Sequence, residues 1–154
     1  MASPMTETAA SIPDAPPAPY RRVVLKISGE GFTKPGGFGI DHDELAIIAG
    51  EIASAAALGT EIAVVVGGGN IMRGGELARE GQIAQATADY MGMLGTVING
   101  LALKEALDRI DTPARLMSAI EIPAVSEPFI RGRALRHFEK GRVLVMAAGT
   151  GNPF

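Results

Sequence analysis

The chain has 154 residues, of which 47% are hydrophobic and 20% are charged, with a net charge of −3 and no cysteine. This length supports one domain with a buried core. The lack of cysteine excludes disulfides, thiolate nucleophiles and cysteine metal sites, and two histidines far apart in the sequence disfavour a zinc site. The acidic balance argues against a nucleic-acid partner, which requires a concentrated basic face. No apolar run reaches the roughly 18–20 residues of a membrane helix. A soluble, cytoplasmic protein with no membrane partner is predicted.

The first residues differ in composition from the rest of the chain. Residues 1–19 hold half of the prolines, together with much alanine, serine and threonine. Such a segment cannot bury enough apolar surface to offset the entropy lost on ordering. We therefore predict a disordered tail over residues 1–20 and one domain over residues 21–154. The tail has neither the basic nor the apolar region of a signal peptide, and the acids Glu7 and Asp14 argue against a transit peptide.

A strand is predicted over residues 23–27, where Lys26 is the single charge. Lys26 either extends from the surface as an ordinary exposed lysine or reaches a phosphate beside the glycine-containing turn over residues 28–31. The next segment, residues 33–39, contains too much glycine and proline to be regular. A loop of this kind caps a site or a subunit contact, or it is a plain surface connector.

A helix and a second strand follow. Asp41 or Asp43 is the predicted N-cap of the helix, and Gly59 stands where the glycine after a helix end belongs. Residues 62–66 form an unbroken apolar run rich in β-branched residues, which is typical of a buried parallel strand.

Three glycines, residues 67–69, end this strand. Their backbone N–H groups can approach an anion closely because no side chain intervenes. The alternative is a flexible strand-to-helix turn without a ligand. Arg73, just beyond the glycines, either binds phosphate oxygens or faces solvent.

A long helix is predicted from residue 82 to residue 110. Its apolar residues at helical spacing are predicted to form one core face: Met91, Leu94, Ile98, Leu101 and Leu107. Asp89 near the beginning of this helix either answers the helix dipole or accepts a hydrogen bond from a ligand hydroxyl.

The last third repeats the alternation of strands and helices. A short strand is predicted over residues 115–117, a helix from residue 126 to residue 141 and a final strand over residues 143–147. The basic residues of that helix region are predicted to form a solvated face: Arg131, Arg133, Arg136, Lys140 and Arg142. The pattern predicts an α/β fold with three layers, an open and mainly parallel sheet with helices on both faces. A last glycine loop without a following helix predicts truncation at the C-terminus.

Three predicted strands thus run into loops of glycine and small polar residues. In an open α/β sheet the loops at the carboxyl ends of parallel strands meet in one crevice, which predicts a phosphate site. The Gly-x-x-x-x-Gly-Lys-Ser/Thr motif of P-loop proteins is absent, and no Gly-x-Gly-x-x-Gly follows a strand.

These loops carry a resemblance to a known family. The segment Lys26-Ile27-Ser28-Gly29-Glu30 resembles the opening signature of the amino acid kinase family, and Gly67-Gly68-Gly69-Asn70 resembles its second phosphate loop. Within the family, the chain is most similar to the bacterial branch that phosphorylates uridine monophosphate (UMP). The segments that carry this similarity are residues 37–41, 69–74, 89–96, 114–119 and 149–154.

The resemblance implies transfer of the γ-phosphoryl group of ATP to UMP, with Mg²⁺ held by the nucleotide phosphates. It implies that Lys26 is catalytic and stabilises the equatorial oxygens of the transferred group. The implied ATP-binding residues are Lys26, Ile27, Ser28, Gly29, Gly69 and Arg73. The implied UMP-binding residues are Gly68, Asp89, Thr150, Gly151, Asn152, Pro153 and Phe154.

The resemblance also implies a homohexamer that GTP activates and UTP inhibits. The implied allosteric region consists of Lys34, Pro35, Gly36, Gly37, Phe38 and Gly39. The positions that match the effector site are Lys104, Asp108 and Arg115. Of these, Asp108 does not resemble a phosphate-binding residue, because it is acidic.

Two other functions fit part of the pattern. A related kinase acting on a carboxylate or a carbamate would share Lys26 and the glycine loops, but not the signatures at Asp89 and residues 150–154. A non-catalytic, nucleotide-binding regulatory fragment is favoured only by the early end of the chain.

Overall fold

The computed structural model describes residues 20–72, 78–79, 81 and 83–153. The predicted disordered tail over residues 1–20 lies almost wholly outside these residues and stays a prediction. Within the part of the chain that is described, no helix is both long enough and apolar enough to cross a membrane.

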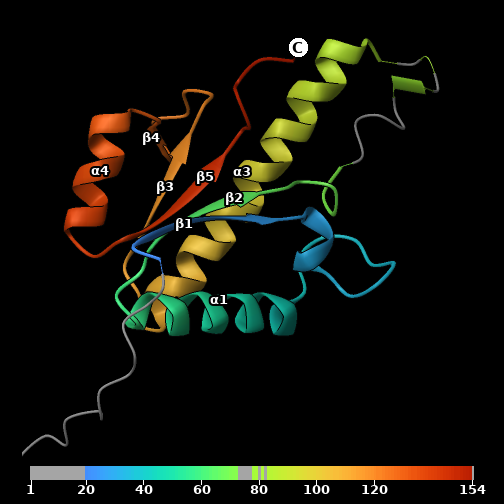
Figure 1. The fold of residues 1–154 in the computed structure, drawn as a ribbon. Coiled ribbons are helices and arrows are strands. Elements are labelled where there is room, and N and C mark those ends of the chain that lie inside the picture. The colour runs from blue at the N-terminus through green and yellow to red at the C-terminus, as the bar shows by residue number, and fades with distance from the viewer. Residues whose placement is uncertain (1–19, 73–77, 80, 82, 154) are drawn as a thin grey trace, which may run out of the picture.

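Five strands form one sheet in which every neighbouring pair is parallel, in the order β1-β2-β5-β3-β4 (Figure 1). The open parallel sheet predicted from the sequence is therefore confirmed. Ile27 pairs with Val66, and Val65 pairs with Met146, so β1, β2 and β5 end side by side. The strands are β1 (Arg22–Ile27), β2 (Glu61–Val66), β3 (Ala114–Ser118), β4 (Glu127–Pro128) and β5 (Val143–Ala147).

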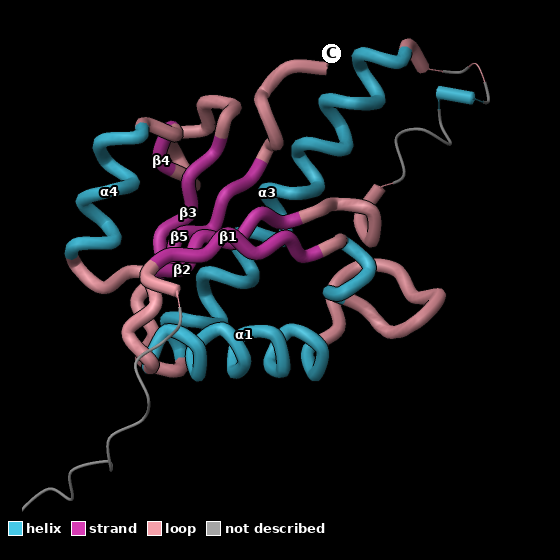
Figure 2. Tube along the Cα trace, in the orientation of Figure 1, coloured by secondary structure: helices cyan, strands magenta, loops and turns pink. Residues whose placement is uncertain are grey.

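Helices cover both faces of the sheet, which gives the predicted three layers (Figure 1; Figure 2). One face packs on α1 and α3 in the main core, which includes Ile52 of α1 and Leu103 of α3. The opposite face packs on Ala134 and Phe138 of α4. The helical elements are η1, a 3-10 turn (Gly29–Phe32), α1 (His42–Ala57), α3 (Gln85–Arg109) and α4 (Arg131–Glu139).

The ends of α1 follow from single residues. The Asp41 carboxylate accepts hydrogen bonds from the backbone N–H groups of Asp43 at 2.9 Å and Glu44 at 3.2 Å, so Asp41 is the N-cap. Of the two predicted caps, Asp41 is therefore the one used. Gly59 follows the C-terminal end with a φ of +86°, a conformation that glycine adopts without strain.

The predicted core face of α3 is wrong in part. Leu107 is fully buried, but Leu94 and Ile98 are each 46% exposed. The buried face includes several small residues, because α3 lies so close to the sheet that a Cβ on Gly100 would stand 2.6 Å from Leu116 Cδ1. The positions of glycine and alanine therefore help to decide which face of this helix turns inward, together with leucines nearer its C-terminal end. Its buried residues are Ala88, Gly95, Val97, Asn99, Gly100, Leu103 and Leu107.

The predicted beginning of the last helix at residue 126 is also wrong. Glu127 and Pro128 instead form β4, which pairs with Met117 and Ser118 of β3, and α4 begins only at Arg131. Proline disfavours helical geometry in the residue before it, which keeps Glu127 extended.

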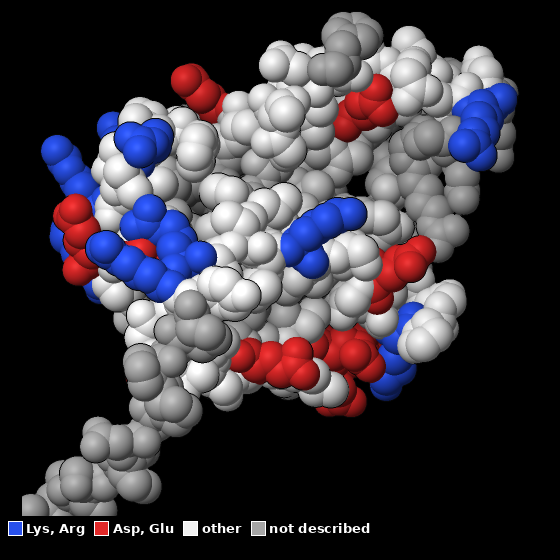
Figure 3. Space-filling view, in the orientation of Figure 1, with Lys and Arg blue, Asp and Glu red and all other residues white. Residues whose placement is uncertain are grey.

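The predicted solvated face of the last helix is confirmed in its main feature. Arg131, Arg133, Arg136 and Lys140 are exposed, and Figure 3 shows basic side chains gathered over α4, on the side away from the acidic side chains over α1. Arg142 is only half-buried and donates to Nδ1 of His137 at 3.1 Å.

Candidate functional site

The glycine loops that follow β1 and β2 are in direct contact. The Gly67 N–H donates to the carbonyl oxygen of Ile27 at 2.7 Å. A Cβ on Gly29 would stand 2.3 Å from the backbone nitrogen of Gly69, and a Cβ on Gly67 would stand 2.6 Å from the nitrogen of Gly29. Side chains would therefore push the two loops apart. Glycine at these positions keeps two sets of backbone amides together, which is the arrangement that binds phosphate groups.

The second glycine loop rests on the N-terminal half of α3. A Cβ on Gly68 would stand 2.8 Å from both the carbonyl oxygen of Gly92 and the nitrogen of Thr96. Asp89 lies one helical turn before this contact, on the same helix. Its carboxylate is half-buried and accepts from the side-chain amide of Gln85 at 2.8 Å. The structure thus brings Gly68 and the helical turn after Asp89 together.

The loop after β5 reaches the same helix. The Ala148 N–H donates to Thr96 Oγ1 at 2.7 Å, and Thr96 Oγ1 donates to the carbonyl oxygen of Met93 at 2.6 Å. Ala148 itself adopts a φ of +67°, which is strained for a residue with a Cβ. A Cβ on Gly151 would stand 2.7 Å from the carbonyl oxygen of Ala119, so this loop also packs closely on the end of β3.

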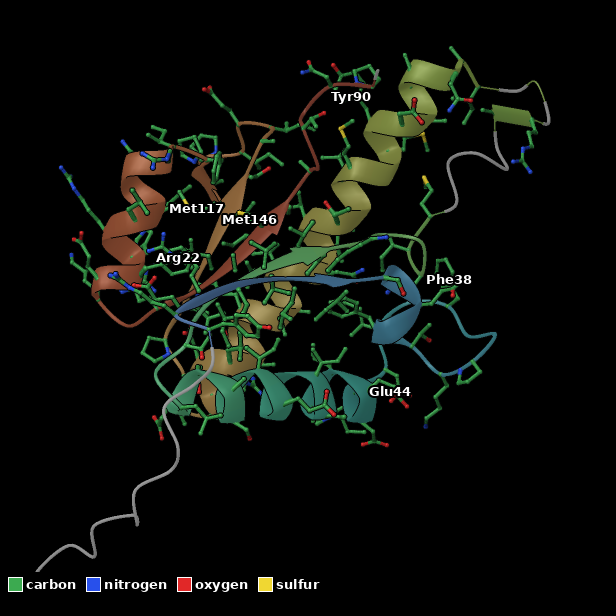
Figure 4. The ribbon with its side chains drawn as sticks, viewed as in Figure 1. Arg22, Phe38, Glu44, Tyr90, Met117 and Met146 are labelled. Carbon is green, nitrogen blue, oxygen red and sulfur yellow. The ribbon has the colours of Figure 1, made fainter. Side chains whose placement is uncertain are left out.

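Lys26 lies on the opposite face of β1 from the main core. Val23 and Ile27 pack toward α1 and α3, so the alternation of the strand directs Lys26 to the other face, where it is exposed. Its partner in register, Val65, lines a cavity of about 280 Å³. Met117 and Met146 also line this cavity, and Figure 4 shows these two side chains next to each other.

This cavity is large enough to hold part of a small ligand. Its rim includes Gly149 and Thr150 of the loop after β5, and its volume approaches the lower end of the range for small-molecule sites. Ser28, Gly69 and Thr150 are all exposed, so a ligand has open access to the three loops. A larger hollow of about 420 Å³ between α1 and α3 is lined by none of the glycines of these loops.

The family is settled by comparison with known proteins. The model of the amino acid kinase family matches residues 21–153. The chain belongs to the amino acid kinase family. The predicted resemblance and fold are thereby confirmed, while the phosphate-binding role of the glycine loops after β1 and β2 stays a prediction.

The chain is also similar to individual proteins whose names are more specific than that of the family. A protein of Rubrobacter xylanophilus called uridylate kinase is 55% identical over 97% of this chain, and one of Aliarcobacter butzleri with the same name is 53% identical over 87%. The crystal structure of a UMP kinase from Bacillus anthracis matches 89% of the chain with a TM-score of 0.84 and 41% identity. The chain spans 59%, 57% and 56% of these three proteins, respectively.

Two predicted ligand residues lie outside the described residues. These are Arg73, predicted to bind ATP, and Phe154, predicted to bind UMP. The rest of the predicted acceptor loop, residues 150–153, is described, and within it the Asn152 N–H donates to Thr150 Oγ1 at 3.3 Å.

The predicted allosteric region, residues 34–39, is an irregular loop held at both ends. Lys34 Nζ lies 3.3 Å from the Asp41 carboxylate, and the hydrogen bond between them raises the pKa of Lys34. The backbone N–H of Glu44, together with Lys34, holds the pKa of Asp41 below its ordinary value, although desolvation opposes them. Phe38 is 82% exposed and extends from the loop (Figure 4).

The three positions predicted from the family's effector site do lie together, but two of them neutralise each other. Lys104 Nζ is 2.6 Å from the Asp108 carboxylate, which also accepts from the Ala114 N–H at 3.0 Å. Burial alone would raise the pKa of Asp108, but these hydrogen bonds hold it below its ordinary value. Arg115 instead donates to the carbonyl oxygen of Ala114 at 2.8 Å. The charge of Lys104 is therefore already paired.

Sequence reasoning missed one polar residue behind the glycine loops. Asn99 of α3 is fully buried and donates to the carbonyl oxygen of Gly67 at 2.7 Å. An amide in the middle of the apolar run Val97-Ile98-Asn99-Gly100-Leu101 is the signal that points to it, because a buried polar side chain requires partners.

Proposed function

We propose that this chain provides the phosphate loops of a UMP kinase, which transfers the γ-phosphoryl group of ATP to UMP and yields UDP and ADP in pyrimidine nucleotide biosynthesis. The observation that carries the proposal is the backbone contact between the glycine loops after β1 and β2, which leaves no room for side chains, and the packing of the loop after β5 on the same turn of α3 as Gly68. The relatives named uridylate kinase support the choice of UMP as the acceptor.

The loop after β1 and the outer part of the glycine loop hold the donor. Ser28 and Gly29 bind the ATP phosphates, with the exposed amide of Gly69 and with Arg73. An oxygen of the UMP phosphate attacks the γ-phosphorus while the bond to the β-phosphate oxygen breaks. Lys26 is the catalytic residue, since its ammonium group reaches both phosphates and stabilises the charge on the equatorial oxygens. Mg²⁺, which the ATP phosphates would hold, would neutralise part of that charge.

The opposite side of the glycine loop holds the acceptor. Gly68 offers its amide to the UMP phosphate, and Asp89 accepts hydrogen bonds from the ribose hydroxyls. Residues 150–154 surround the nucleotide. This assignment is supported by the contacts that Gly68 and the last loop share with α3. Both Gly68 and the start of the last loop pack against the helical turns that follow Asp89.

Assembly and regulation follow the branch that the chain resembles. We propose a cytoplasmic homohexamer, activated by GTP through residues 34–39 and inhibited by UTP. Exposed apolar side chains on one side of α3, those of Tyr90, Leu94 and Ile98, support self-association. At the positions that match the family's effector site, the pairing of Lys104 with Asp108 leaves little free charge for a GTP phosphate. A titration of GTP into a turnover assay therefore tests the proposed activation, and a flat response contradicts it.

The acceptor site is tested by thermal melts of the chain with UMP and with AMP as the control. At a hundredfold excess over Kd, a ligand that binds only the folded state stabilises it by about 2.7 kcal/mol. For a domain of this size that raises the Tm by roughly 5–10 °C. A shift with UMP alone supports the proposal. A cooperative melt that ignores UMP favours a carboxylate or carbamate kinase, or a regulatory fragment.

The role of Lys26 is tested with Lys26→Met. The variant should lose turnover, measured on the longest natural chain that contains this sequence, and should bind UMP as before. Lys140→Met, which removes an exposed lysine after α4, is the matched control and should change neither property. Equal loss of turnover and of UMP binding in Lys26→Met contradicts the assignment.

A further inference from the structure

Two asparagines behind the glycine loop form a closed pair. Asn99 Nδ2 donates to Asn70 Oδ1 at 2.6 Å, and Asn70 Nδ2 donates to Asn99 Oδ1 at 3.0 Å. Both residues are buried: Asn99 has no exposed surface, and Asn70 is 2% exposed. Buried amides are costly unless they find partners, so this pair specifies one arrangement of the segments that carry it.

The pair ties three segments together. Asn99 comes from the middle of α3, and its amide also donates to the carbonyl oxygen of Gly67 at 2.7 Å. Asn70 ends the glycine loop, and its amide also donates to the carbonyl oxygen of Gly39 at 2.7 Å. The backbone adds a further link, because the Gly39 N–H donates to the Asn70 carbonyl oxygen at 2.9 Å.

The geometry makes each asparagine necessary for the other. Every polar atom of the two side chains has a partner, and among the described residues no buried side-chain nitrogen or oxygen lacks one. Replacing either side chain with an apolar one therefore leaves the Oδ1 atom of the other without its partner in the core, and leaves its Nδ2 group with only the hydrogen bond to a backbone carbonyl. The glycine loop has few alternative anchors, since its glycines contribute no side chains of their own.

We propose that Asn99 is a positioning residue that fixes the glycine loop of residues 67–70 from behind and couples it, through Asn70, to the loop of residues 34–39. The inference rests on the proposed function, in which these two loops are the phosphate site and the effector region. Asn99 touches no ligand. It acts by holding the Gly67 carbonyl group, so that the amides of Gly68 and Gly69 face the phosphates.

A consequence is that the two loops cannot move independently. A displacement of Gly39 breaks its contacts with Asn70 and weakens the Asn70–Asn99 pair, which in turn releases Gly67. A ligand that binds residues 34–39 in one conformation then changes the affinity of the glycine loop for phosphate. By linkage, a nucleotide bound at the glycine loop changes the affinity for that ligand by the same factor.

The test compares Asn99→Leu with Leu103→Ala by hydrogen exchange of the chain. Leu103 is fully buried one turn further along α3 and makes none of the asparagine contacts, so its variant weakens the core alone. We expect Asn99→Leu to accelerate exchange of the Gly39 and Gly67 amides by about tenfold or more beyond the change in the sheet amides. Leu103→Ala should accelerate all three groups alike. Asn99→Asp, which keeps the size of the side chain but cannot donate to Gly67, serves if Asn99→Leu does not fold.

Binding supplies the second readout. We expect the Kd for UMP to rise about tenfold in Asn99→Leu, and to change by less than about twofold in Leu103→Ala under conditions where both are folded. If exchange and affinity change equally in the two variants, Asn99 is only a core residue and the inference is overturned. If the unaltered chain does not bind UMP, the proposed function fails, while the exchange pattern still decides whether Asn99 positions the two loops.

Discussion

Gly29→Ala tests whether the two phosphate loops depend on glycine for their contact. The added Cβ would stand 2.3 Å from the nitrogen of Gly69 and 2.7 Å from Asn70 Oδ1, so the loops must open by about 1 Å to reach ordinary van der Waals distance. Overpacking of this kind costs about 1–3 kcal/mol. Alanine offsets roughly 0.4–1 kcal/mol of this cost by restricting the unfolded chain, which leaves a net loss of up to about 2.6 kcal/mol.

A thermal melt measures the result of this substitution. For a domain of about 150 residues, we expect this net loss to lower the Tm by up to roughly 10 °C. The Tm increase produced by ATP should fall as well, because Gly29 and the displaced Gly69 belong to the loops proposed to bind the ATP phosphates. Gly50→Ala in α1 is the matched control, since a Cβ there meets no atom within 4 Å and the change should raise the Tm slightly. A Gly29→Ala variant that has the same Tm as Gly50→Ala and the same Tm increase with ATP refutes the requirement for glycine.

Two further predictions concern single hydrogen bonds. Thr96→Val removes the acceptor of the buried Ala148 N–H. We expect the free energy of unfolding, measured by denaturant titration, to fall by about 1–3 kcal/mol and UMP binding to weaken. A fall of less than about 0.5 kcal/mol contradicts this prediction. Asp41→Asn keeps an N-cap but removes the carboxylate, whose pKa the Glu44 N–H and Lys34 hold below 3.8 in the folded state. The extra stability of the natural chain over this variant is then complete above pH 3.8 and disappears as the pH falls through the lowered pKa. Melts of both proteins between pH 7 and pH 2.5 measure it, and a constant difference in Tm contradicts the assignment.

β1, β2 and β5 were predictable because each contains a short run of apolar, partly β-branched residues that is followed by a glycine loop. Residues 62–66 become β2 with one residue added, and residues 143–147 become β5 without change. The meeting of the loops was predictable for a topological reason, since parallel strands bring their carboxyl ends to one edge. The lateral order of the strands was not predictable, because β5 lies between β2 and β3 and no local pattern specifies that insertion.

The two errors on helices have different physical origins. Large apolar residues at helical spacing indicated the buried face of α3, yet Leu94 and Ile98 stay half exposed while Gly95 and Gly100 turn inward. Periodicity weighs side chains by hydrophobicity, whereas close packing of a helix on a sheet selects for the absence of a side chain. The early beginning predicted for α4 failed because Pro128 suits an edge strand as well as a first helical turn.

The triple glycine of residues 67–69 was open to two interpretations from sequence, a phosphate nest or a plain turn. The contacts of the loop support a part of each interpretation. Gly67 and Gly68 are required for packing, because they approach Gly29 and α3 closely. Gly69 is exposed, and a Cβ added to it would meet no atom within 4 Å. Two glycines therefore serve packing and one serves access. An alanine at Gly68 should thus lower stability, whereas an alanine at Gly69 should leave the melt unchanged and weaken only the binding of ATP. A melt of each variant with and without ATP separates these effects, and equal destabilisation by both substitutions contradicts the division of roles.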